Sequence, residues 1–196
     1  MEKGERVIDA YELNVNDIVV DVSIRIKEDE PVPLYIISIT NISNVTKIIL
    51  EKIRDEFVAE GTKRLNEEQD ISNIQEQFRE SILKLLAKYF PDADRKTTDM
   101  LINYILQQNI GFGNLDILLK DTNLEEITIN NANEPVWVYH RTYGWLKTNV
   151  LVPSESRIRH YSTIIGRDVG KEITVLNPLM DAHLKTGDRV NATLFP

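Results

Sequence analysis

A chain of 196 residues has room for one or two domains, and its 42% hydrophobic and 28% charged content is that of a globular protein. The absence of Cys excludes a disulfide scaffold and Cys-based metal or redox chemistry. The apolar runs are too short to span a bilayer, and no leader with a cleavage site opens the chain. We therefore expect a cytoplasmic protein without direct membrane insertion.

Charge is distributed unevenly along the chain. The net charge of −8 argues against a nucleic-acid partner. Residues 135–196 carry eight basic and five acidic side chains, whereas residues 1–134 carry 15 and 26. The basic end favours a surface that faces an anion such as a nucleotide phosphate. Ordinary scatter of charge accounts for the same counts and remains the alternative.

The first 62 residues predict a small antiparallel sheet with one helix. A weak strand from Val7 to Leu13 precedes a strong one, in which apolar side chains alternate from Ile18 to Ile26, and a third strand follows near residues 35–39. Apolar residues then recur every three or four positions between Val45 and Phe57, which predicts a helix packed on the sheet.

Residues 63–110 predict a helix pair that acts as a scaffold between two sheets. Ser72 and Gln75 have the spacing of a capping box, and an apolar helical face runs from Ile71 to Phe90, where Pro91 ends it. A second helix begins near Asp92 or Asp94. Its expected core residues are Leu101, Ile102, Ile105 and Leu106.

Residues 111–196 predict a mixed α/β domain. A helical turn at residues 115–119 leads into a strand around Ile127, and a hairpin with aromatic side chains turns at Gly144. A helix capped by Ser154 follows. We expect a short strand at residues 173–175 and a last strand from Arg189 to Phe195. The whole chain is thus predicted to be α+β, with units 1–62, 63–110 and 111–196.

At these residues a family resemblance emerges. The motifs are GNLDILLKD at 113–121, EEI at 125–127, VYHR at 138–141, YGWL at 143–146, GR at 166–167, PLMDA at 178–182 and GDRVN at 187–191. They resemble the N-terminal domain of secretion ATPases, the hexameric motors of type II secretion, type IV pilus assembly and the archaellum, and most of all the archaeal branch. The match covers residues 111–196 well, residues 60–110 loosely and residues 1–60 hardly at all.

The resemblance implies a regulatory and interaction region. In these ATPases the catalytic core follows this domain and binds ATP and Mg, the subunits form a homo-hexamer, and a polytopic membrane platform protein receives the motion. The chain contains no G-x-x-x-x-G-K-S/T loop to hold phosphates. We therefore expect an N-terminal fragment that binds no cofactor and hydrolyses no ATP alone, peripheral to the inner face of the membrane when assembled.

The resemblance also singles out three arginines that reach nucleotide across the cleft between domains, namely Arg189, Arg141 and Arg167. A guanidinium is always charged, and its planar fork matches phosphate oxygens. The alternatives are exposed strand charges at Arg141 and Arg189, and a cation beside a helix C-terminus at Arg167.

The other polar groups give weaker indications of function. The three His residues lack metal-ligand spacing, and the carboxylates at 116, 121, 125 and 126 lack a calcium-loop pattern, so we expect a solvated acidic face and no metal site. The hairpin aromatics predict cross-strand packing, with an adenine-stacking platform as the minor reading. A stand-alone sensor or adaptor with a PAS-like fold remains the alternative function. A P-loop encoded downstream of Pro196 would exclude that alternative.

Overall fold

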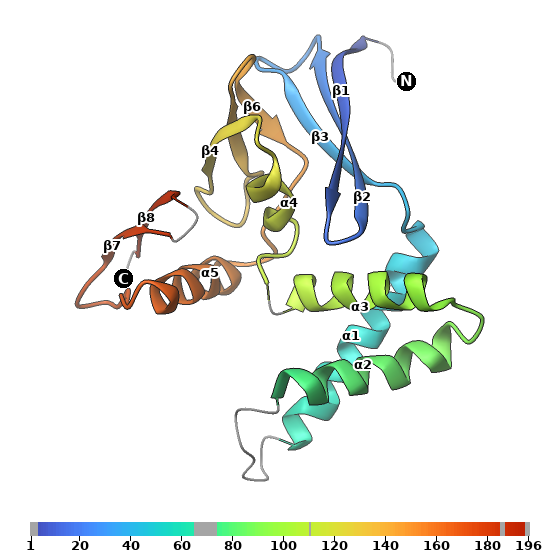
Figure 1. The fold of residues 1–196 in the computed structure, drawn as a ribbon. Helices are drawn as coiled ribbons and strands as arrows, with labels where there is room; N and C mark the ends of the chain where they lie inside the picture. Colours follow the sequence, from blue (N-terminus) through green and yellow to red (C-terminus); the bar gives the residue numbers. More distant parts are fainter. Residues whose placement is uncertain (1–3, 65–73, 110, 185–186, 195–196) are drawn as a thin grey trace.

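The computed structural model describes residues 4–64, 74–109, 111–184 and 187–194 and has the predicted α+β class (Figure 1). The large sheet contains β1 (Glu5–Val15), β2 (Ile18–Lys27), β3 (Leu34–Ile39), β4 (Leu124–Thr128), β5 (Trp137–His140) and β6 (Gly144–Thr148). The helices are α1 (Asn44–Arg64), α2 (Ile74–Tyr89), α3 (Arg95–Asn109), α4 (Leu115–Lys120) and α5 (Glu155–Asp168). A separate hairpin pairs β7 (Leu179–His183) with β8 (Arg189–Thr193).

The first hairpin follows directly from the sequence pattern. Along β2 the alternate side chains from Ile18 to Ile24 are fully buried, whereas Ile26 at the end of the strand is 46% exposed. Asn16 and Asp17 join it to β1 with φ of 53° and 67°, which is the left-handed geometry that a two-residue hairpin turn requires and that Asn and Asp tolerate. The strand β3 then pairs antiparallel with β2.

The six strands are ordered β1-β2-β3-β6-β5-β4, so strands from both ends of the chain share one sheet. The junction is a short parallel pairing of β3 with β6. The Asn149 side chain extends it, because its amide donates to the Ile37 carbonyl and accepts from the Ile37 N–H, each at 2.9 Å. The sequence analysis expected two separate sheets. The boundaries of the three units stay a prediction.

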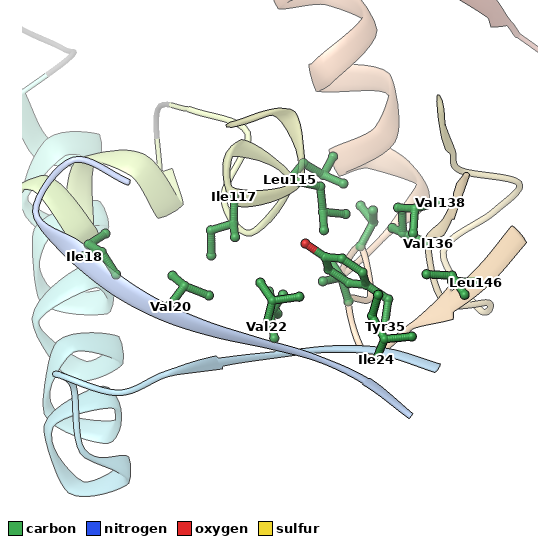
Figure 2. Packing of buried hydrophobic residues seen from close by; sticks show 14 of the residues in the cluster. Ile18, Val20, Val22, Ile24, Tyr35, Leu115, Ile117, Val136, Val138 and Leu146 are labelled. Carbon is green, nitrogen blue, oxygen red and sulfur yellow. The ribbon is translucent and has the colours of Figure 1, made fainter. Parts of the chain in front are cut away.

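The core of the sheet lies between its concave face and α4 (Figure 2). Tyr35 sits at its centre, with its ring among aliphatic side chains of neighbouring strands. The buried members that surround it include Ile18, Val20, Val22, Ile24, Leu115, Ile117, Leu118, Val136, Val138 and Leu146. The short helix α4 therefore covers the sheet, and Tyr161 of α5 closes the same cluster.

Helix α1 does not cover the sheet, and that expectation was wrong. Leu50 and Ile53 are buried against α2 and α3 in a second cluster, while Val45 and Ile48 are mostly exposed. The physical reason is that α4 already occupies the apolar face of the sheet, and α2 and α3 offer α1 an apolar surface of their own. Three helices thus form a bundle at one end of the sheet (Figure 1). Ser72 and Ile71 lie outside the described residues.

The C-terminal region differs from expectation in one strand. Residues 173–175 are not a strand, because Thr174 and Asn177 close a tight turn by exchanging backbone hydrogen bonds of 3.0 and 3.1 Å. The strand forms later, as β7. Ser154 caps α5 as predicted, accepting from the Arg157 N–H at 3.2 Å. The strand β8 begins at Arg189 as expected, and Phe195 lies outside the described residues.

Gly166 allows the chain that follows α5, around Lys171, to pack closely against the helix. A Cβ at this position would lie 2.5 Å from the Lys171 carbonyl oxygen, so any larger residue would force the chain apart. In the part of the chain that the structure describes, no helix combines the length and apolarity that a membrane crossing requires.

Candidate functional site

The β7–β8 hairpin presents two different faces. Met180 and Ala182 are buried on the side of α5, whereas the alternate residues of β7 and β8 are exposed on the outer face. Arg189 lies on that outer face and forms a two-pronged pair with Asp181, with Nε to Oδ1 at 3.0 Å and Nη2 to Oδ2 at 2.7 Å. The adjacent guanidinium holds the pKa of the Asp181 carboxyl below its usual range. The hairpin therefore holds the Arg189 fork in one orientation.

The other two arginines lie elsewhere. Arg167 is exposed in the last turn of α5, next to the hairpin, whereas Arg141 follows β5 in the large sheet. Arg141 donates from its guanidinium to the Thr122 carbonyl and from its backbone N–H to the Asn123 carbonyl at 3.0 Å. Arg189 and Arg167 thus both lie in the C-terminal part of the chain formed by α5 and the β7–β8 hairpin. Arg141 instead holds the segment between α4 and β4.

The sequence analysis missed a buried carboxylate. Asp121, expected on a solvated face, is only 3% exposed. Its Oδ2 accepts hydrogen bonds from the Tyr11 and Tyr35 hydroxyls at 2.5 and 2.6 Å, and its Oδ1 accepts from the Asn123 N–H at 2.9 Å. Burial, and then the bond to Asp121, raises the pKa of both tyrosines. No spacing signalled this cluster, because Tyr11 and Asp121 are 110 residues apart.

This cluster joins the two edges of the curled sheet. Tyr11 belongs to the edge strand β1, and Asp121 is the C-cap of α4, in the short segment that leads to the other edge strand, β4. A second bond of 3.2 Å, from the Tyr143 hydroxyl to Asp9, ties β1 to the β5–β6 turn. Hydrogen bonds between side chains beside α4 therefore connect the β1 edge with the β4–β6 half of the sheet, where no backbone hydrogen bonds pair the strands.

His140 lies beside the hydrogen bonds that join the two edges of the sheet, and it is 3% exposed. Its Nδ1 accepts from the Thr142 N–H at 3.1 Å, so the neutral ring carries its proton on Nε2. Nε2 is buried and has no hydrogen-bond partner among the described residues. Burial lowers the pKa of His140, although Asp121 and Asp9 pull it upward. Burial therefore favours the neutral form of the ring in the folded protein.

This arrangement predicts an acid-dependent loss of stability. Because the folded pKa of His140 is below its ordinary 6.5, its contribution is present above pH 6.5 and is lost as the pH falls below it. Urea unfolding at pH 7 and pH 5 should show a smaller loss of stability on acidification in His140→Phe than in the unchanged protein. The exposed His160, substituted by Gln, is the control and should change the pH dependence less. Equal effects of both substitutions would contradict the assignment.

In the described ranges, no three His, Asp or Glu side chains lie close enough to hold a metal ion. No nucleophile with an adjacent base emerges from the described hydrogen bonds either, and Asp121 is enclosed by tyrosines.

No known protein-family profile matches the chain. Three uncharacterized proteins of Methanocaldococcus jannaschii are similar to it. MJ1288 is 33% identical over 65% of this chain, MJ0781 is 26% identical over 96%, and MJ0900 is 33% identical over 45%. The aligned parts make up 51%, 25% and 16% of these relatives. The chain therefore spans from about one half down to about one sixth of the length of these relatives.

Proposed function

We propose that the chain is the N-terminal regulatory and interaction region of a hexameric secretion-type ATPase that serves secretion, a pilus or an archaellum. It closes over ATP and Mg bound in a following ATPase core, and it couples hydrolysis to a polytopic membrane platform protein. The motifs between residues 113 and 191 that resemble this family support the proposal.

The observation that carries the proposal is the outer face of the β7–β8 hairpin. A two-stranded sheet is marginally stable alone, and here only one of its faces rests on the protein. Leu179 on the other face is 72% exposed, and Leu176 in the preceding turn is 95% exposed. Such apolar side chains beside a charged fork are typical of a surface that another domain covers.

The geometry of Arg189 suits a role at that surface. A guanidinium has five N–H donors, and Asp181 takes one from Nε and one from Nη2. The remaining donors are available to phosphate oxygens on an opposing domain. When the domains close and water leaves, a charge-assisted bond from this fork strengthens, so closure and charge stabilisation occur together. Arg167 and Arg141 are the further candidates for this contact.

The length of the relatives supports a region within a longer protein. In MJ0781, the stretch similar to this chain fills a quarter of the sequence. A region of this kind therefore occurs joined to further sequence of about three times its own length, which leaves room for a P-loop core and other domains.

ATP turnover tests the proposal. We expect the complete protein to hydrolyse ATP as a hexamer, and purified residues 1–196 to hydrolyse none and to remain monomeric, because half of each subunit interface is missing. Phosphate release and light scattering at micromolar concentration measure both properties. Turnover that copurifies with residues 1–196, or a complete protein that hydrolyses no ATP, would overturn the proposal.

A further inference from the structure

The convex face of the β4–β5–β6 half of the sheet exposes an aromatic row. Val138 and Leu146 point into the core and are fully buried, so their neighbours Tyr139 and Trp145 point outward. Tyr139 pairs with Trp145 on β6 and with Glu126 on β4, which places the three side chains side by side across three strands. Tyr139 is 37% exposed and Trp145 is 42% exposed.

The two rings meet nearly at right angles. Their centroids are 5.4 Å apart and their planes are inclined by 82°. An edge-to-face pair leaves ring faces uncovered, and the negative face of an indole or phenol attracts a cation within about 6 Å. Tyr139 and Trp145 therefore present two ring faces that are nearly perpendicular, and one cationic group can contact both.

A carboxylate completes the row. Glu126 is exposed on the edge strand β4, where it accepts a hydrogen bond from the Thr128 hydroxyl at 3.3 Å. Two cations on the same convex face are already neutralised, Lys147 by Glu30 at 3.0 Å and Arg25 by Glu5 at 3.1 Å. None of the ion pairs among the described residues includes Glu126. Its charge is thus available to a cation from outside.

We propose that Glu126, Tyr139 and Trp145 form a binding site for an Arg or Lys side chain of a basic protein partner. The two ring faces attract the cation, and Glu126 supplies its counter-charge. The net charge of −8 draws basic partners and repels nucleic acid. Tyr and Trp are also the residues that most often dominate binding energy at protein interfaces. The site lies on the large sheet, apart from the β7–β8 hairpin, and does not depend on the proposed ATPase role.

Titration of the whole chain with acetyl-tetra-arginine amide tests the site. In ¹H–¹⁵N spectra, the Trp145 indole N–H, identified by its absence in Trp145→Leu, and the backbone N–H groups of β5 and β6 should shift and saturate with this peptide. The backbone signals also report the affinity of Trp145→Leu, which lacks the indole. Acetyl-tetraglutamine amide should leave it unmoved. Trp145→Leu and Glu126→Gln should each weaken binding by about two- to fivefold, since a cation–π contact and an exposed ion pair each contribute up to about 1 kcal/mol.

Glu12→Gln provides the matched control, because Glu12 is an exposed carboxylate on β1 and its loss changes the net charge equally. It should leave the affinity unchanged. Equal weakening by Glu12→Gln and Glu126→Gln would show non-specific attraction and overturn the site. Unchanged binding by Trp145→Leu would do the same. Because Glu126→Gln alters only an exposed side chain, its result stands even if Trp145→Leu fails to fold.

Discussion

Asp121→Ala is expected to lower the free energy of unfolding by about 3–5 kcal/mol, because it leaves buried donors without an acceptor. The Tyr11 and Tyr35 hydroxyls and the Asn123 N–H all donate to this carboxylate. At about 2–4 °C per kcal/mol for a chain of this size, the melting temperature should fall by roughly 10 °C or more. Urea unfolding and calorimetry measure the two quantities.

A double-mutant cycle separates the hydrogen bonds from general damage to the core. Tyr35→Phe should destabilise the native protein clearly, because it removes a charge-assisted bond. In the Asp121→Ala background the same substitution should cost little or even stabilise, since the hydroxyl no longer has its acceptor. Strictly additive effects would show that the bond contributes little and that Asp121 acts by filling space.

Arg189→Ala in the complete protein is expected to lower kcat at least about tenfold, and up to about 10³-fold if Arg189 acts as an arginine finger. Lys should rescue poorly, because an ammonium cannot reproduce the planar fork. The melting temperature of residues 1–196 should barely change, since both side chains of the Arg189–Asp181 pair are more than half exposed. Steady-state ATP turnover and thermal unfolding measure these effects.

Arg141→Ala and Arg167→Ala are the matched comparisons, because each removes one exposed guanidinium. Arg141 is bound to the Thr122 carbonyl, so its loss should affect the β4–β5 region of the sheet more than turnover. If kcat is unchanged in all three variants, the arginine-finger assignment fails. A large decrease in melting temperature with Arg189→Ala would indicate that the residue holds the hairpin together.

Features encoded by neighbouring residues were predictable from the sequence. The alternation from Ile18 to Ile24, the Ser154 cap and the Gly144 turn each depend on side chains within a few positions of one another. The period of such a pattern identifies a strand or a helix without knowledge of the partner. The α+β class follows from these elements and is confirmed.

Features that depend on distant residues were missed. The apolar stripe of α1 predicted a helix with one buried face, but not whether that face lies on the sheet or on α2 and α3. A carboxylate that is 3% exposed cannot be distinguished in the sequence from a solvated one, because Tyr11 and Tyr35 approach Asp121 only in the folded chain. The Asp121 cluster therefore lay beyond local patterns, whereas the resemblance had already singled out Arg189, Arg141 and Arg167.

The first 60 residues illustrate the same limit. With little family signal, they were predicted to form a small sheet with one helix as a unit of their own, residues 1–62. The structure places β1–β3 in the sheet, and Tyr11 and Tyr35 supply two of the three hydrogen bonds to Asp121. Deletion would expose the edge of β6 and remove two of the three hydrogen bonds to Asp121.

The parallel junction between β3 and β6 also affects the order in which the chain folds. Ile37 and its partner Asn149 are 112 residues apart, and the four helices α1 to α4 are synthesised between them. Contacts of such high sequence separation form late, after the entropy of closing a long loop has been overcome. During synthesis the edge of β3 remains unpaired until β6 leaves the ribosome, which makes this strand the part of the nascent chain most exposed to aggregation.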